Sequence, residues 1–284
     1  MAYVPVWDHL KPNLEGIKLV ICDLWGVMHN GVELFPEAVA AIEGVRREAI
    51  ETVFLTNAPK PASLIREQLN DKGLPIALQD NIMSSGAQAR AYVREHYQGK
   101  SLYHMGPSMD HQAVEGLPVT VTEDIQKADL IFASGLDHST VEAHDATLEI
   151  ALRNKVPFLC ANPDRVVHFG HKLWLCAGSI AEVYEGQGGE TLWFGKPSEG
   201  AFQDCAKLAG MEEQILPHEV LVIGDSLLTD IAGAQRLGHK SLLITTGIHR
   251  KSFSAMAERV HWPAIQGLPA DDVFPTALMA HLRF

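Results

Sequence analysis

The feature of this chain that most constrains its fold is a series of short apolar runs, each of which ends in polar or turn residues. Continuous Val, Ile and Leu runs of this length are typical of strands that are buried on both faces of a parallel sheet. These runs cover residues 18–22, 52–55, 129–133, 156–160 and 220–223. Segments with helical periodicity separate the runs, and this alternation predicts an α/β fold with a parallel sheet.

Two of the separating segments carry helix signals that locate their ends. Apolar residues at helical spacing predict one helix over 141–152, and Ser139–Glu142 has the pattern of a capping box at its start. A second apolar stripe runs from Phe202 to Ala209, and Gly210 follows it at the position that commonly ends a helix. Polar residues therefore gather at the carboxyl ends of the strands, where open α/β sheets bind ligands.

Composition excludes several classes of function. The chain has 284 residues, 46% of them hydrophobic, which is enough for one large core or two smaller ones. The formal net charge of −12 argues against nucleic acid or an anionic membrane as a main partner, because both bind through clustered Lys and Arg. No apolar run reaches the roughly 18 residues of a membrane span. Charged residues interrupt the first 20, so we expect no signal peptide.

The four cysteines give a further expectation about the protein's compartment. They are widely spaced, with no C-x-x-C pair, and three of them lie in apolar surroundings. Buried free thiols in a reducing compartment fit this pattern, so we expect a cytoplasmic protein. The cysteines are Cys22, Cys160, Cys176 and Cys205.

Two motifs in the first quarter of the chain place polar groups directly after buried strands. In Cys22–Val27 a carboxylate, Asp23, follows the first run. In Leu55–Pro59 the residues Thr56 and Asn57 offer a hydroxyl, an amide and backbone N–H groups. Each motif alone is weak, because a strand-end aspartate often only caps the next helix.

Two further motifs lie in the second half of the chain. Lys196 stands in a rigid Gly/Pro frame, Phe194–Ser198, which a surface lysine rarely needs. Asp225 and Asp230 lie five residues apart in the run Ile223–Asp230, where a strand passes into a helix. Ser226 also lies at this junction and either caps the helix or binds a ligand.

Together, in this order and each at a strand or helix junction, the four motifs resemble those of the haloacid dehalogenase superfamily. The resemblance extends from about Lys18 to about His249. It implies a Rossmann-like core with a parallel sheet. It also implies a Mg²⁺-dependent hydrolase, most often a phosphatase, that acts on a small phosphorylated metabolite.

The spacing of the motifs points to one branch of this superfamily. Lys196 follows Thr56 by 140 residues but precedes Asp225 by only 29. Since a strand–helix unit takes about 30 residues or slightly more, a large segment is inserted between the second and third motifs. This is similar to class IIA, the NagD-like and nitrophenyl-phosphatase-like proteins, which have an α/β cap at this point. We predict a core over 1–86 and 176–284 and a cap over 87–175.

Three short segments near the ends of the insert support the assignment to class IIA. They are Ser84–Ala87, Ala161–Asp164 and Cys176–Ser179.

The resemblance implies a role for each motif. Asp23 attacks phosphorus and forms an aspartyl-phosphate, which water then hydrolyses. Mg²⁺ is held by Asp23, the backbone carbonyl of Trp25 and Asp225, and it offsets the repulsion between carboxylate and phosphate. Lys196 adds positive charge at the transferring group, while Thr56 and Asn57 hold its oxygens.

The fourth motif fits either a role at the site or a structural role. The helix that starts at Ser226 can complete the anion site with its N-terminus, and Asp230 steers Lys196 or a metal-bound water. Asp230 fits a structural cap equally well. Ser226 and Thr229 fit helix caps better than ligands.

One position departs from the family pattern. Phosphatases of this superfamily carry a second aspartate two residues after the nucleophile, where it protonates the leaving group, and here that residue is Trp25. An indole has no titratable proton near neutral pH, so this chain lacks a general acid at the usual place.

Several explanations of Trp25 stay open at this point. His29 replaces the missing acid, or the natural leaving group needs no proton, as in acyl or aryl phosphates. Dehalogenases of the family do have an aromatic residue here, but their cap is inserted elsewhere. In a last alternative the protein has lost turnover and binds a phosphorylated ligand as a regulatory protein. Retention of Asp23, Lys196 and Asp225 favours chemistry.

The substrate cannot be identified beyond its class. Sugar phosphates, nucleotides and cofactor phosphates all fit. The expected cap offers Asp164, His168 and His171 as groups that recognise the leaving group, with Asp164 as our main candidate. Caps of this type often pair, so a homodimer is possible.

Overall fold

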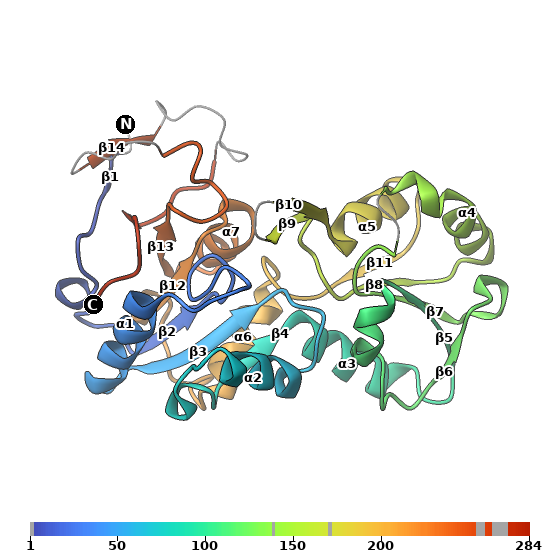
Figure 1. Ribbon diagram of the computed structural model, residues 1–284, viewed down its shortest axis with the longest axis horizontal. Helices are drawn as coiled ribbons and strands as arrows, with labels where there is room; N and C mark the ends of the chain where they lie inside the picture. Colours follow the sequence, from blue (N-terminus) through green and yellow to red (C-terminus); the bar gives the residue numbers. More distant parts are fainter. Residues whose placement is uncertain (1–2, 138–139, 170–171, 254–258, 263–271) are drawn as a thin grey trace. The chain divides into compact units, whose positions relative to one another are not determined.

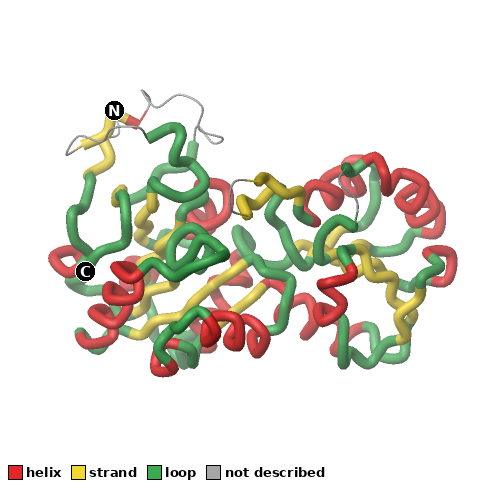
Figure 2. The backbone as a smooth tube through the Cα atoms, viewed as in Figure 1, coloured by secondary structure: helices red, strands yellow, loops and turns green. Residues whose placement is uncertain are grey.

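A computed structural model describes residues 3–137, 140–169, 172–253, 259–262 and 272–284 (Figures 1 and 2). Its contacts divide the chain into two compact units. Unit 1 holds Met1–Thr56, Arg66–Met83 and Lys196–Phe284, and unit 2 holds Asn57–Ile65 and Ser84–Gly195. Each unit is built around a sheet of its own, so the two are described separately.

Unit 1 is organised around a six-stranded sheet. Its central strands, β2 (Leu19–Cys22) and β12 (Val220–Gly224), pair in parallel, and all four residues of β2 are buried, as expected for a strand covered on both faces. Across the sheet the strands are β15 (Ala277–Met279), β13 (Lys240–Ile244), β12 (Val220–Gly224), β2 (Leu19–Cys22), β3 (Glu51–Thr56) and β4 (Ile82–Ser84).

Helix α6 (Glu199–Leu208) packs an apolar face on this sheet. Ala201, Phe202 and Cys205 of α6 join the core with side chains from β2, β3 and β12. A Cβ atom at Gly233 would lie 2.2 Å from the Phe202 ring, so the glycine lets α7 approach α6 closely. The helices are α1 (Pro36–Arg47), α2 (Ala62–Asp71), α6 (Glu199–Leu208) and α7 (Ala232–Arg236), with η1 (Lys11–Asn13), η2 (Ile76–Leu78), η6 (Pro217–Glu219) and the π-helical turn η7 (Leu227–Ile231). The contacts group the start of α2, up to Ile65, with unit 2. A small antiparallel sheet pairs β1 (Tyr3–Pro5) with β14 (Arg259–His261).

Unit 2 contains a five-stranded parallel sheet and an antiparallel hairpin. In order across the sheet its strands are β11 (Thr191–Trp193), β8 (Phe158–Cys160), β7 (Leu130–Ala133), β5 (Ser101–Met105) and β6 (Thr120–Thr122). The hairpin pairs β9 (Val166–Phe169) with β10 (Lys172–Leu175). The helices are α3 (Ser85–His96), α4 (Asp145–Asn154) and α5 (Ala177–Gly186), with short turns η3 (Ser108–Ala113), η4 (Ile125–Lys127) and η5 (Glu142–His144).

Two hydrophobic clusters cover opposite faces of the unit 2 sheet. Leu102, Leu130 and Phe132 pack with α3 and with the segment that follows η3. Met105 and Ile131, which point to the other face, pack with α4 and α5. This alternation along β5 and β7 is what a sheet covered on both sides requires.

The α/β class and the five predicted strands are confirmed, as is the helix that ends before Gly210. The predicted start of a helix at 141 is wrong. The α-helix begins at Asp145, because Glu142–His144 wind into a tighter 3₁₀ turn in which His144 is buried. Ser139 of the proposed capping box lies outside the described residues.

The contact units differ from our predicted domain boundaries near residue 175. We placed α5 and β11 with the core, whereas their contacts group them with unit 2. The reason is that β11 pairs in parallel with β8, and Ala177 and Ile180 of α5 belong to the unit 2 cluster. The boundaries of a cap domain stay a prediction.

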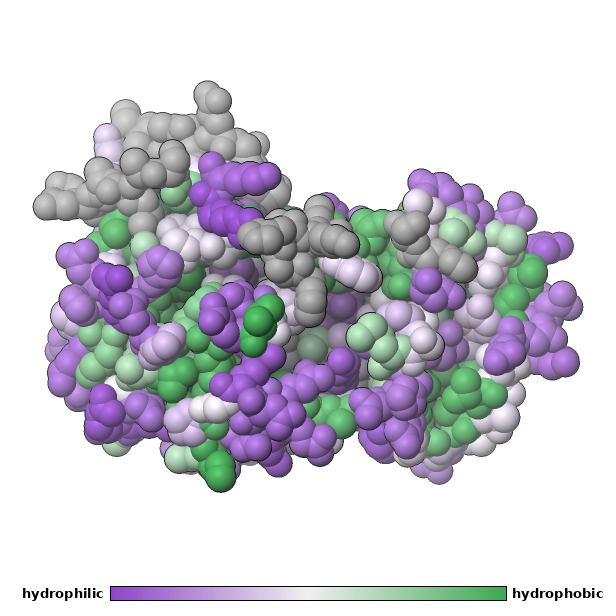
Figure 3. Space-filling model, viewed as in Figure 1, coloured by the Kyte–Doolittle hydropathy of each residue, from purple (hydrophilic) through white to green (hydrophobic). Residues whose placement is uncertain are grey.

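The visible surface carries hydrophilic side chains over both units, with apolar residues interspersed among them (Figure 3). None of the described helices has the length and apolar character needed to cross a bilayer. All four cysteines are buried and free.

Candidate active site

Asp23 and Asp225 lie at the point in unit 1 where the strand order reverses. Asp23 follows β2 and Asp225 follows β12, and the Asp23 N–H donates to the Ile223 carbonyl across the two strands at 2.8 Å. From β2 the chain continues to β3 on one side, and from β12 to β13 on the other. Ligands bind at such switch points in open α/β sheets.

The structure brings three of the predicted carboxylates together. Side-chain oxygens of Asp23, Asp225 and Asp230 lie within 4.8 Å of one another, and all three residues are buried. Carboxylate oxygens are the ligands that hard divalent cations such as Mg²⁺ prefer. The group is therefore suited to hold such an ion.

Lys196 joins this group and links two of its members. Its Nζ donates to Oδ1 of Asp23 at 2.5 Å and to Oδ1 of Asp230 at 2.7 Å, and only 3% of the residue is exposed. Burial alone would lower the pKa of Lys196, but the two carboxylates raise that pKa above its ordinary value. The lysine is therefore charged and fixed.

Asp225 has a different surrounding. Its Oδ2 accepts a hydrogen bond from the Ile248 N–H at 2.8 Å. Burial, together with the charges of Asp23 and Asp230, holds its pKa well above the ordinary value, although the Ile248 N–H and Lys196 act in the opposite direction. The site around Asp225 is thus rich in negative charge and favours an added cation.

Two glycines let the backbone approach Asp225 closely. A Cβ atom at Gly26 or at Gly247 would lie 2.1 Å from Oδ2 of Asp225, so neither position tolerates a side chain in this arrangement. Gly26 also has φ +83°, which favours glycine. Gly26 was expected only as part of the motif Cys22–Val27, and Gly247 was not identified, although a glycine shortly after β13 was a usable signal.

Asp230 connects Lys196 to the start of the helical segment after β12. Its Oδ2 accepts from the Ser226 N–H at 3.2 Å and from the Thr229 hydroxyl at 3.4 Å. The next N–H, that of Leu227, donates to Nε2 of His249 at 3.1 Å. The first turn is the π-helix η7, a feature that is frequent at functional sites. His249 was not among the residues predicted from the sequence.

Trp25 and His29 form a compact loop with Gly31. Their rings meet edge to face at a centroid distance of 5.1 Å, and a Cβ atom at Gly31 would lie 2.7 Å from the indole. Nδ1 of His29 accepts from the Gly31 N–H at 3.0 Å. Burial, and to a smaller extent the charge of Lys72, lowers the pKa of His29 to about 4. His29 is therefore neutral at pH 7, which makes it a poor proton donor.

The other predicted residues are placed as follows. Thr56 is buried at the end of β3 in unit 1. Asn57 belongs to unit 2, where its Nδ2 donates to Oδ1 of Asp164 at 2.9 Å. His168 lies in β9, and His171 lies outside the described residues. Two of our substrate-binding candidates, Asn57 and Asp164, are thus partners of each other.

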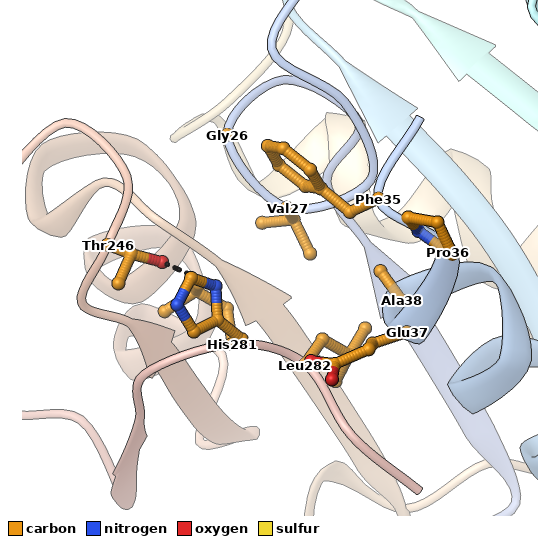
Figure 4. Close-up of a pocket in the computed structure, with 10 residues that line it drawn as sticks. Gly26, Val27, Phe35, Pro36, Glu37, Ala38, Thr246, His281 and Leu282 are labelled. Atoms are coloured by element: carbon orange, nitrogen blue, oxygen red, sulfur yellow. Dashed lines mark hydrogen bonds between the residues drawn. The ribbon is translucent and has the colours of Figure 1, made fainter. Parts of the chain in front are cut away.

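A pocket of about 200 Å³ lies in unit 1 (Figure 4). Val27, Phe35 and Leu282 give it apolar walls, and Thr246 and His281 contact each other at its side at 3.4 Å. None of the three clustered carboxylates lines it. Gly26, which lies against Asp225, is the residue of the pocket lining that links it to the cluster.

Two family models match the chain. The model described as haloacid dehalogenase-like hydrolase matches residues 20–120, and a second HAD-hydrolase-like model matches residues 193–266. The first range contains Asp23, and the second contains Lys196, Asp225 and Asp230. Both matches therefore include residues of the carboxylate cluster.

Individual relatives cover most of the chain. The 5'-nucleotidase YutF of Bacillus subtilis is 24% identical over 84% of this chain and 91% of its own length. The ribonucleotide monophosphatase NagD of Escherichia coli is 26% identical over 82% of this chain and 89% of its own. A crystal structure of a haloacid dehalogenase-like hydrolase from Brucella suis has a TM-score of 0.83 at 28% identity, covering 98% of this chain and 100% of that one.

Proposed function

The chain belongs to the haloacid dehalogenase superfamily of hydrolases, class IIA, and from this membership we propose that it is a Mg²⁺-dependent phosphatase with Asp23 as its nucleophile. The observation that carries the proposal is the buried cluster in which Lys196 contacts Asp23 and Asp230 beside Asp225. A carboxylate, an ammonium group and a cation-binding oxygen in one place meet the needs of phosphoryl transfer.

The residues of the cluster fit a magnesium ion. Among the described residues of the cluster, there are three buried carboxylates and the single ammonium group of Lys196, and burial followed by the charges of Asp23 and Asp230 raises the pKa of Asp225. Asp23, Asp225 and the backbone carbonyl of Trp25 would hold the ion. When bound, Mg²⁺ reduces the repulsion between the phosphate group and the nucleophilic carboxylate.

In this mechanism, each of these side chains of unit 1 has its own role in the reaction. An Asp23 oxygen forms a bond to phosphorus while the bond from phosphorus to the leaving oxygen breaks. A water molecule then attacks phosphorus, the bond to Asp23 breaks, and inorganic phosphate leaves. Lys196 and the Thr56 hydroxyl stabilise the charge on the transferring group, and Asp230 positions Lys196. The roles predicted for Asn57, Ser226 and Asp164 in substrate binding stay predictions.

The relatives support a small phosphorylated metabolite as substrate. YutF and NagD are both named for the hydrolysis of nucleotides. We propose a substrate of the same chemical class, a phosphate monoester of a sugar, a nucleotide or a cofactor.

We predict that Mg²⁺ binds at Asp225. Addition of Mg²⁺ should raise the Tm of the wild-type protein, because a ligand that binds only the folded state stabilises it. Asp225→Asn should lose most of that rise, and chelation should abolish hydrolysis of nitrophenyl phosphate. Differential scanning calorimetry with and without Mg²⁺ measures the effect.

Asp80→Asn is the matched control, because Asp80 is an exposed aspartate in the same unit. It should respond to Mg²⁺ as the wild type does. Activity that survives exhaustive chelation would contradict the magnesium site.

We predict that the rate depends steeply on the pKa of the leaving group. The reason is that Trp25 occupies the usual position of the general acid and has no titratable proton. Aryl and acyl phosphates should react faster than sugar phosphates. Trp25→Asp should raise the rate on alkyl phosphates by about tenfold or more, which is a part of the roughly 10²–10⁴-fold that a general acid typically contributes. His29→Ala should leave the dependence unchanged, since His29 is neutral at pH 7. The measurement is kcat/KM against leaving-group pKa.

Two other outcomes of this series are informative. A flat dependence in the wild type that becomes steep in His29→Ala would assign the acid to His29. No turnover of any ester, combined with retained affinity for phosphate ligands, would make the protein a phospholigand-binding protein.

A further inference from the structure

Unit 2 has a switch point of its own, at the carboxyl ends of β5 and β7. These strands are neighbours, yet the chain leaves them toward opposite sides, from β5 to the edge strand β6 and from β7 to β8. The connection after β5 packs on one face of the sheet, and α4, in the connection after β7, packs on the other. In doubly wound sheets with this strand order, ligands bind outside the carboxyl ends at this point.

Four polar side chains meet at this place. Nε2 of His104, on β5, lies 2.9 Å from Oγ of Ser134, which follows β7. Asp110 of η3 is hydrogen-bonded to Ser134, and Lys60 Nζ lies 3.9 Å from Oδ1 of Asp110. All four belong to unit 2, although Lys60 comes from the separate segment Asn57–Ile65.

The hydrogen bonds determine which group donates the proton at each contact of the cluster. The Ser134 hydroxyl has one proton, which it donates to the Asp110 carboxylate. His104 must therefore carry the proton of its own bond to Ser134. A Cβ atom at Gly106 would lie 2.1 Å from the Ser134 Oγ, so a glycine is required beside the cluster. These residues form a preorganised network rather than a set of independent surface groups.

The cluster is partly buried, and part of its surface is exposed and can contact a ligand. The side chains of Asp110 and Lys60 are 14% and 21% exposed. Burial raises the pKa of Asp110, against the effect of Lys60 and Ser134, and burial lowers the pKa of His104. The 3.9 Å between Lys60 and Asp110 exceeds a hydrogen bond, so each retains capacity for another partner.

The charges decide which ligand fits. Asp110 accepts hydrogen bonds and repels anions, while Lys60 donates hydrogen bonds. The pair therefore matches ligand groups that both donate and accept hydrogen bonds. Adjacent hydroxyl groups have this property and a phosphate does not. We propose that Lys60, His104, Asp110 and Ser134 form a binding site in unit 2 for an uncharged polyhydroxyl group, such as a sugar ring.

The same chemistry is offered by the sugar part of a phosphorylated substrate and by a free sugar. In the first case the inference rests on the proposed phosphatase function and makes these residues determinants of specificity. In the second case the site is independent of it. The experiment separates the two sources.

The test is a titration of the full chain with D-ribose, followed by two-dimensional NMR of the backbone amides. The amides of Gly106, Ser134 and Gly135 should shift and saturate. Asp110→Asn and Lys60→Met should each raise the Kd by about tenfold or more, since tenfold is the lower end of the loss for one hydrogen bond to a charged group. Asp129→Asn and Lys100→Met are matched controls, because this exposed pair of the same unit lies at a similar 3.8 Å. Neither control should change the Kd.

This titration needs no turnover, so a failure of the phosphatase proposal leaves it intact. Ribose that inhibits hydrolysis of nitrophenyl phosphate competitively, with an inhibition constant equal to its Kd, assigns the sugar to the substrate. Ribose that binds without inhibition assigns it to a separate ligand. The inference is overturned if these amides do not shift at the highest soluble ribose concentration, if Asp110→Asn and Lys60→Met bind like the wild type, or if inorganic phosphate shifts them more strongly than ribose.

Discussion

The Asp23→Asn variant is expected to lose at least about 10⁴-fold in kcat with nitrophenyl phosphate and Mg²⁺, a loss typical of removing a nucleophile. The amide is uncharged and a poor nucleophile, so the bond to phosphorus does not form. The variant should still fold, because the amide has nearly the same shape and Lys196 keeps its contact with Asp230. Steady-state kinetics and thermal unfolding measure the two effects.

Asp80→Asn should retain wild-type kinetics and thereby control for the chemical change itself. Wild-type activity in Asp23→Asn would remove Asp23 from the mechanism. Loss of both activity and folding would instead assign Asp23 a structural role.

The Lys196→Met variant is expected to lose both stability and activity. Methionine fills a similar volume but leaves Asp23 and Asp230 buried beside each other without their cation. Breaking a buried ion pair in this way costs about 3–5 kcal/mol of the free energy of unfolding. The loss of a positive charge at the transferring group should also reduce kcat by about 10²-fold or more. Urea unfolding without Mg²⁺ at pH 7 measures the first effect.

The pH dependence of this difference has a definite sign. The pKa of Lys196 is raised by folding, so its contribution to stability is fully present below its ordinary value of 10.5 and is lost only as pH rises above that value. The variant should therefore be destabilised at pH 7 and at pH 9 alike. Lys18→Met is the control, since its pair with Glu219 has the same 2.7 Å length but the lysine is 56% exposed. It should lose less than about 1 kcal/mol. Equal losses in both variants would contradict the account of Lys196.

The sequence predicted the centre of the candidate site because that centre depends on strand ends. β2 and β12 are continuous apolar runs, and the residues directly after them, Asp23 and Asp225, are placed by the parallel pairing of the two strands. Lys196 lies far away in sequence, and only its Gly/Pro frame and the family resemblance pointed to it.

The contacts that tune the site could not be predicted in the same way. Asp225 accepts a hydrogen bond from the backbone N–H of Ile248, and a backbone donor cannot be identified from the residue type in the sequence. The close approach of Gly26 and Gly247 depends on where two loops meet, and sequence spacing does not determine that. The low pKa of His29 likewise follows from burial in a folded loop.

In unit 2 a whole strand, β5, could not be predicted from the sequence. Ser101–Met105 mixes polar and apolar residues, so β5 lacks the continuous apolar run that identified its neighbours. The switch point between β5 and β7 was therefore missed, and with it the cluster around Asp110. A helix start was misplaced for a related reason, because the 3₁₀ turn before α4 depends on tertiary burial of His144.

Chemical trapping of the aspartyl-phosphate shows whether Asp23 is the nucleophile. The protein with Mg²⁺ is mixed with excess nitrophenyl phosphate, quenched within milliseconds, and reduced with borohydride, which converts an aspartyl-phosphate to homoserine. Mass spectrometry of the peptide that contains Asp23 should show homoserine at position 23, and omission of substrate should show none. If the protein hydrolyses the ester but position 23 remains aspartate, or homoserine appears at Asp225 or Asp230 instead, Asp23 is not the nucleophile.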